Sequence, residues 1–162
     1  MGKTVLLDTN FIVGLFNSAD RLHENSSFIF KLLWKERSRI IMIIPPLCIY
    51  EVIVVLRRAG VDINTIQQKI MKLLMIDNMI VHTVNELSAL RQSSGLLVGT
   101  TVKTNDFIIA STGMDYSALI ITFDKGLRDR LKPLYEDVYY CTRASGAATN
   151  EMAPFLSKLY SA

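Results

Sequence analysis

The sequence KTVLLDTN at residues 3–10 is the starting point for predicting the fold. Residues 3–7 form a short run rich in β-branched residues and leucine, which predicts a buried strand. The run stops at the polar sequence Asp8-Thr9-Asn10, and a helix is expected from Phe11 to Phe16. Strands and helices then continue to alternate along the rest of the chain.

Four more short apolar runs predict strands, at residues 40–44, 79–82, 118–122 and 138–141. Further helices are expected at residues 23–37, 46–58, 63–74, from residue 83, at 104–114 and at 151–160. The predicted strands are continuously apolar, which is typical of a parallel sheet that is covered on both faces. The sequence therefore predicts a three-layer α/β domain with a central parallel sheet of about five strands.

The length of 162 residues fits a single domain, with a core over about residues 4–141 and a C-terminal tail at 142–162. Half of the residues are apolar, as in soluble globular proteins. The formal net charge is +3, so a site that gathers four carboxylates leaves +7 over the remaining surface. A polyanionic partner is consistent with this balance.

Two cysteines, Cys48 and Cys141, stand in apolar runs and are expected to be buried thiols. No CxxC or Cys/His spacing indicates zinc. A reducing compartment fits this usage, so we expect a cytoplasmic protein. No signal peptide is visible, and the apolar run at residues 40–56 contains two prolines and Glu51 and is too short to span a membrane.

Four acidic residues are expected at the edge of the sheet where ligands bind, beyond the carboxyl ends of the strands. Asp8 directly follows the first strand, and Asp124 follows the fourth. Glu51 lies early in the helix after the second strand, and Asp106 lies at the start of the helix before the fourth. These acids could therefore converge at one rim.

Each acid also has a structural alternative. Asp8 and Asp106 could cap helices, and Asp124 in the sequence Asp-Lys-Gly could be a turn residue. Glu51 is harder to explain in this way, because it stands in a segment otherwise too apolar to face water. A lone buried acid costs several kcal/mol unless it is paired or binds a cation.

A cluster of carboxylates favours a divalent cation. Mutual repulsion raises the pKa values of clustered acids, and a bound cation removes that repulsion. Hard oxygen ligands suit Mg²⁺ or Mn²⁺, which retain water molecules and bind substrate phosphate. Such a site supports phosphodiester hydrolysis by a metal-bound water.

Four segments together resemble the sequence motifs of the PIN-domain nucleases. Asp8-Thr9-Asn10, after an apolar strand, resembles the first motif of that family. Three further segments resemble the second, third and fourth motifs in turn: PLCIYEV at residues 46–52, NDFIIA at 105–110 and ITFDK at 121–125. The resemblance covers roughly residues 5–141, with all four motifs in order and at plausible spacings.

The resemblance implies a Rossmann-like PIN fold, dependence on Mg²⁺ or Mn²⁺, and single-stranded RNA as the substrate. It implies that Asp8 and Asp106 are the central metal ligands, and that Glu51 and Asp124 are further ligands, either directly or through water. Many members carry another acid two residues after the fourth one, whereas this chain has Gly126. A second metal site is therefore expected to be weak or absent.

Supporting residues are expected around these acids. By the same resemblance, Thr9 and Thr122 match hydroxyl positions that orient the acids, and Asn10 matches a polar turn residue. Lys125 and Arg128 closely follow the fourth acid, so they are the best candidates for contact with a substrate phosphate.

Small single-domain members of the family are often VapC-type toxins, which dimerise and are silenced by an antitoxin. We therefore expect an endoribonuclease that is the toxin of such a pair. A homodimer is also expected because apolar residues are in surplus on helices outside the sheet core, as at Trp34, Met71, Leu74 and Met75. Two alternatives stay open: a catalytically weak RNA-binding or scaffold module, and a structure-specific DNA nuclease.

Overall fold

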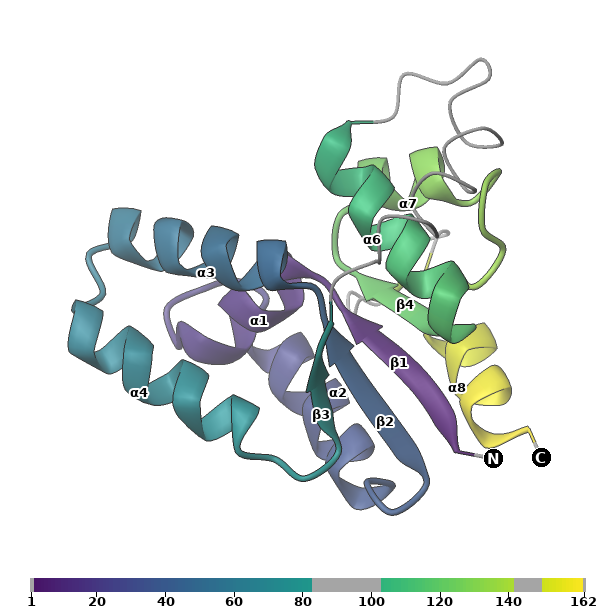
Figure 1. Cartoon of the computed structure of the whole chain (residues 1–162), viewed down its shortest axis with the longest axis horizontal. Helices are drawn as coiled ribbons and strands as arrows, with labels where there is room; N and C mark the ends of the chain where they lie inside the picture. The colour runs from purple at the N-terminus through teal and green to yellow at the C-terminus, as the bar shows by residue number, and fades with distance from the viewer. Residues whose placement is uncertain (1, 83–102, 142–149, 162) are drawn as a thin grey trace.

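A five-stranded, all-parallel sheet forms the centre of the molecule, in the order β3-β2-β1-β4-β5 (Figure 1). The structure is a computed structural model and describes residues 2–82, 103–141 and 150–161. The strands are β1 (Lys3–Leu7), β2 (Ile40–Ile44), β3 (Met79–Val81), β4 (Leu119–Thr122) and β5 (Val138–Tyr140). All five predicted strands are present, with ends within one residue of the expected ones.

Helices flank the sheet, which confirms the predicted α/β fold (Figure 1). They are α1 (Thr9–Phe16), α2 (His23–Lys35), α3 (Pro46–Arg58), α4 (Ile63–Leu74), α6 (Thr104–Tyr116), α7 (Lys125–Leu131) and α8 (Met152–Tyr160). The helix expected from residue 83 lies outside the described residues. Helix α7 was not predicted from the sequence. None of the described helices is long and apolar enough to cross a membrane.

The order of the strands divides the molecule into two halves that meet at β1 and β4. The chain first runs from β1 outward to β2 and β3, and it later returns to place β4 on the other side of β1. In Figure 1, α3 and α4 accordingly lie on the left, and α6, α7 and α8 lie on the right. Ligands in parallel α/β sheets bind at such a reversal of strand order, beyond the carboxyl ends of the strands.

The core is built around the three central strands, where Val5–Leu7, Met42–Ile44 and Leu119–Thr122 are buried. Phe11 of α1 stacks on Phe123 directly after β4, with ring centroids 5.7 Å apart, and this contact joins the two halves. Helix α8 also contributes to the core, because Phe155 is fully buried and meets the Tyr139 ring edge-on. The ordered core therefore includes part of the expected C-terminal tail.

Local signals in the sequence explain where several of these elements begin and end. Pro46 opens α3, where a proline costs little because the first helical N–H groups have no partner within the helix. Asp62 caps α4 by accepting a hydrogen bond from the Thr65 N–H at 3.0 Å. Cys48 and Cys141 are buried, unpaired thiols, as predicted.

Candidate active site

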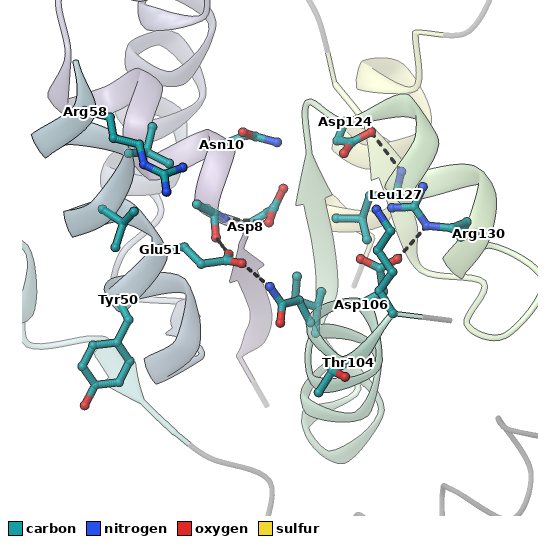
Figure 2. A pocket seen from close by; sticks show the side chains of 16 residues that line it. Asp8, Asn10, Tyr50, Glu51, Arg58, Thr104, Asp106, Asp124, Leu127 and Arg130 are labelled. Carbon is teal, nitrogen blue, oxygen red and sulfur yellow. Dashed lines mark hydrogen bonds and ion pairs between the residues drawn. The ribbon is translucent and has the colours of Figure 1, made fainter. Parts of the chain in front are cut away.

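A pocket of about 750 Å³ opens at the carboxyl ends of β1 and β4 and is lined by all four predicted acids (Figure 2). Asp8 comes from the end of β1, Glu51 from α3, Asp106 from α6, and Asp124 from the turn between β4 and α7. The sheet reversal brings these four segments together although they span more than a hundred residues of sequence. The predicted convergence of the acids at one rim therefore occurs in the fold.

Asp8 is held in place at the floor of the site and is only 3% exposed. One carboxylate oxygen accepts a hydrogen bond from the Thr9 N–H at 2.6 Å, and the other accepts one from the Thr122 hydroxyl at 2.9 Å. Asp8 is also the N-cap residue of α1. Asp8 therefore caps α1 and also lines the acidic pocket, so the two interpretations do not exclude each other.

Burial raises the pKa of Asp8 from 3.8 to about 6. The hydrogen bonds from Thr122 and Thr9 act in the opposite direction, because they stabilise the ionised carboxylate. The negative charges of Glu51 and Asp124 raise the pKa further. Asp8 therefore experiences its acidic neighbours as repulsive, as expected for a carboxylate cluster that favours a cation.

Glu51 links the two sides of the pocket through hydrogen bonds. Its Oε2 accepts from the Thr9 hydroxyl of α1 at 2.5 Å, and its Oε1 accepts from the side-chain amide of Asn105 on α6. Glu51 is partly buried on a helix whose neighbouring residue Val52 is fully buried. These two donors supply part of the compensation that the carboxylate needs in this setting.

Asp106 is buried in the first turn of α6 and forms an ion pair with Arg130 of α7. The Arg130 Nε donates to Asp106 Oδ2 at 2.6 Å. The N-cap residue of α6 is Lys103, so Asp106 is not the capping residue that the structural alternative proposed. The partner of Asp106 is a side chain that the sequence did not single out.

Asp124 is the N-cap residue of α7, with Oδ1 accepting from the Leu127 N–H at 3.0 Å. Its own N–H donates to the Thr122 hydroxyl oxygen at 3.0 Å, while that hydroxyl donates to Asp8. Thr122 thus connects the two acids that follow the central strands, and it is fully buried. The orienting role of Thr122 stays a prediction, and these two hydrogen bonds are consistent with it.

The four acids share a pocket but do not yet form a compact ligand set. Asp8 and Glu51 lie on one side of the pocket, and Asp106 and Asp124 lie on the other (Figure 2). Across the described residues, no three His, Cys, Asp or Glu side chains stand close enough together to hold one metal ion. The donor set suits a hard divalent cation, but Glu51 and Asp106 are engaged with Asn105 and Arg130 instead.

The remaining predicted residues are distributed unevenly around the site. Asn10 lines the pocket, as does Thr9. Lys125 is exposed at the start of α7 and is not among the residues that line the pocket. The Arg128 guanidinium turns to Glu151 and Asp129 and likewise does not line the pocket.

Arg130 and Asn105 line the site but were missed as candidate residues. Arg58 and Lys103 also line the pocket and add positive charge beside the acids. A signal for Arg130 was present, because Leu127 and Leu131 stand four residues apart after a capping aspartate, which predicts a short helix. Such a helix would have placed Arg130 one turn from the acid cluster.

Comparisons with known proteins agree with this fold. Three solved structures resemble the chain: VapBC2 from Rickettsia felis bound to a promoter DNA fragment, VapC20 from Mycobacterium tuberculosis, described as a sarcin–ricin loop cleaving toxin, and PAE2754 from Pyrobaculum aerophilum. Their TM-scores are 0.59, 0.56 and 0.51, at sequence identities of 16%, 16% and 15%.

These alignments cover 78%, 76% and 83% of this chain, and 92%, 92% and 88% of the respective structures. At such identities the likeness concerns the fold alone. A search of curated proteins finds no match. The family model of the PIN domain matches residues 5–131, a stretch that contains all four acids of the pocket and Arg130. The chain belongs to the PIN-domain family.

Proposed function

We propose that this PIN-domain chain is a metal-dependent endoribonuclease that hydrolyses single-stranded RNA. The observation that carries the proposal is the convergence of four acids from separate segments on one pocket at the sheet reversal. A scaffold needs no such cluster, because repulsion among carboxylates lowers stability unless a cation is bound. Burial is the main cause of the raised pKa of Asp8, and the negative charges of Glu51 and Asp124 add to it.

The donor set supports Mg²⁺ or Mn²⁺ as the cofactor. Asp8 and Asp106 would be the central ligands, with Glu51 and Asp124 as further ligands, directly or through water. The bound metal would lower the pKa of a water molecule and neutralise charge on the phosphate. Glu51 would exchange its present hydrogen-bond partner, at least in part, for the ion or its water, whereas Asp106 would keep Arg130 on Oδ2 and offer Oδ1 to the ion.

The chain's own residues prepare the site for a phosphodiester. Thr122 and the Thr9 N–H fix both oxygens of Asp8, so this carboxylate cannot turn away from the pocket. Three cationic side chains, Arg58, Lys103 and Arg130, line the same pocket as the acids and can contact the phosphate backbone. Lys125 and Arg128 remain predicted phosphate contacts. To contact a phosphate, Arg128 would have to leave its ion pairs with Glu151 and Asp129.

The toxin of a toxin–antitoxin pair is the biological role we favour. The solved structures that share this fold include a VapBC complex and a toxin described as cleaving the sarcin–ricin loop. An antitoxin protein would then be the partner, and the cytoplasm would be the site of action. A structure-specific DNA nuclease is the second candidate, and the choice of substrate separates the two.

The test is cleavage of a mixed RNA pool, and of matched single-stranded and structured DNA, with Mg²⁺, Mn²⁺ or EDTA. We expect RNA cleavage with either metal, none with EDTA, and products with 5′-phosphate and 3′-hydroxyl ends. Products with 2′,3′-cyclic phosphate ends would reject attack by a metal-bound water. Preferential cleavage of structured DNA would favour the second candidate.

Two substitutions form a matched pair for this assay. Asp8→Asn and Asp62→Asn each remove one carboxylate from a helix N-cap, and asparagine caps about as well as aspartate. Only Asp8 lies in the pocket, so we expect Asp8→Asn to abolish cleavage and Asp62→Asn to leave it unchanged. Full activity of Asp8→Asn would refute the assigned site.

A further inference from the structure

The guanidinium group of Arg130 lies against the position that a side chain at Gly126 would occupy. A Cβ atom built on Gly126 would stand 3.1 Å from Arg130 Nη1 and 3.2 Å from Asp124 Oδ1. Gly126 does not have the positive φ that favours glycine, since among the described glycines only Gly60 has one. A side chain at this position would crowd Arg130 and Asp124 by a few tenths of an ångström, so the glycine leaves room for both groups.

Arg130 interacts with two of the four acids at once. Its Nε donates to Asp106 at 2.6 Å, and that hydrogen bond raises the pKa of the guanidinium. Burial acts in the opposite direction, and the negative charge of Asp124 adds to the increase. Since Asp106 is buried and the Arg130 side chain is partly exposed at the pocket, the arginine brings a fixed positive charge to the Asp106–Asp124 side.

The two sides of the pocket differ in how their charges are compensated. Asp8 and Glu51 accept hydrogen bonds from neutral groups, namely the two threonine side chains, one N–H and the Asn105 amide. Asp106 instead has a cationic partner, and the same cation acts on Asp124. A divalent ion placed between Asp106 and Asp124 would meet the guanidinium at short range and be repelled by it.

We propose that Arg130 takes the place of a second metal ion on the Asp106–Asp124 side of the pocket. The chain then binds one divalent ion, and Arg130 provides the second positive charge that a substrate phosphate contacts. The planar guanidinium suits this role, because it carries five N–H donors and stays charged at all working pH values. The substrate part of this proposal rests on the proposed function, whereas the metal part does not.

The first experiment counts Mn²⁺ ions per chain by calorimetric titration, with Mn²⁺ electron paramagnetic resonance as a second measure. The parent protein is expected to bind one ion. Arg130→Gln should bind a second ion, or hold the first at least about fivefold more tightly, because a repulsive charge has been removed. Arg130→Lys keeps the charge and should behave like the parent. Lys72→Gln on α4 removes an equal charge far from the pocket and serves as the control.

The second experiment measures binding of a fluorescent single-stranded RNA in EDTA, where no cleavage is expected. Arg130→Gln should weaken RNA binding. It should also make the slope of log K, the binding constant, against log salt concentration shallower by roughly 0.7, the value for one phosphate contact on a single strand. Arg130→Lys should retain most of this dependence, and Lys72→Gln should retain all of it.

Two bound ions in the parent, or unchanged or weaker Mn²⁺ binding by Arg130→Gln, would overturn the proposal. If the Arg130–Asp106 ion pair only stabilises the fold, Arg130→Gln should show unchanged or weaker Mn²⁺ binding and a lower melting temperature than the parent. If no variant binds Mn²⁺, both this proposal and the metal-dependent function fail. If the metal counts are as expected but the parent does not cleave RNA, only the proposed nuclease function fails.

Discussion

Asp8 is placed where its ionisation works against folding. Its carboxylate is buried, which raises its pKa in the folded protein to about 6, above the value of 3.8 expected for an exposed aspartate. Between these two pH values the folded state holds a proton that the unfolded state has released. The contribution of Asp8 to stability therefore decreases as the pH rises from about 4 to 6, and this cost persists at higher pH.

Asp8→Asn should remove this pH dependence. In EDTA at pH 7 the variant should be more stable than the parent by about 1–3 kcal/mol, because no buried charge has to be formed. At pH 4 the difference should become small. Thermal melts of both proteins from pH 4 to pH 8 provide the measurement, and a difference between variant and parent that does not grow as the pH rises would contradict the assignment.

At the scale of helices and strands, the sequence predicted most of what the structure contains. The strands were recognisable because runs such as Ile40–Ile44 are apolar on both faces, as a covered parallel sheet requires. Helix α7 was missed because it has only seven residues and two apolar positions, and Asp-Lys-Gly resembles a turn. That omission also concealed Arg130, the partner of Asp106.

The acids of the site were predictable because sheet topology alone determines which strand ends meet. Their partners were not, since the contacts of Glu51 with Asn105 and of Asp106 with Arg130 depend on side-chain directions across the pocket. The phosphate contact predicted for Arg128 depends in the same way on its ion pair with Glu151.

Helix α8 is tied to the sheet by Glu151, which precedes it. The Glu151 carboxylate accepts hydrogen bonds from the Arg128 guanidinium and from the Tyr140 N–H of β5 at 2.9 Å. Burial raises the pKa of Glu151, but these hydrogen bonds outweigh it, and the net pKa lies below the usual value of 4.5. This contribution to stability is therefore present above about pH 4.5 and is lost as the pH falls through the folded-state pKa.

Glu151→Gln should destabilise the protein by about 1–2 kcal/mol at pH 7, because it removes a charged acceptor from a partly buried arginine. The difference from the parent should shrink as the pH falls below 4.5. Urea unfolding at pH 7 and at pH 4 measures it. Glu136→Gln, which removes one carboxylate at a position between α7 and β5, is the control, and an equal loss in both variants would argue against the specific contact.

At the scale of the whole molecule, apolar side chains remain exposed on α2 and α4. Met75 is 75% exposed, Met71 is 58% exposed and Trp34 is 42% exposed, while Leu74 is partly buried against the core. We expect exposed apolar side chains of these helices to be buried in a homodimer at micromolar concentration. Sedimentation should then give about twice the 18.3 kDa mass of one chain.

Met75→Glu offers a direct test of the dimer. Met75 is the C-cap residue of α4 and is exposed in the single chain, so the fold should survive a charge there, while an interface that buries it should not. We expect a monomer with an unchanged circular dichroism spectrum. A parent that sediments as a monomer at micromolar concentration would refute the dimer.

The reversal of strand order also determines when this pocket can exist during protein synthesis. Asp8 emerges from the ribosome early, but its partner Thr122 lies 114 residues further along the chain, and Arg130 follows later still. At about 5–20 residues per second, several seconds of translation separate the first acid from the last. Until β4 has paired with β1, a nascent chain has no complete acidic pocket. The assembled site therefore exists only after most of the chain has been synthesised.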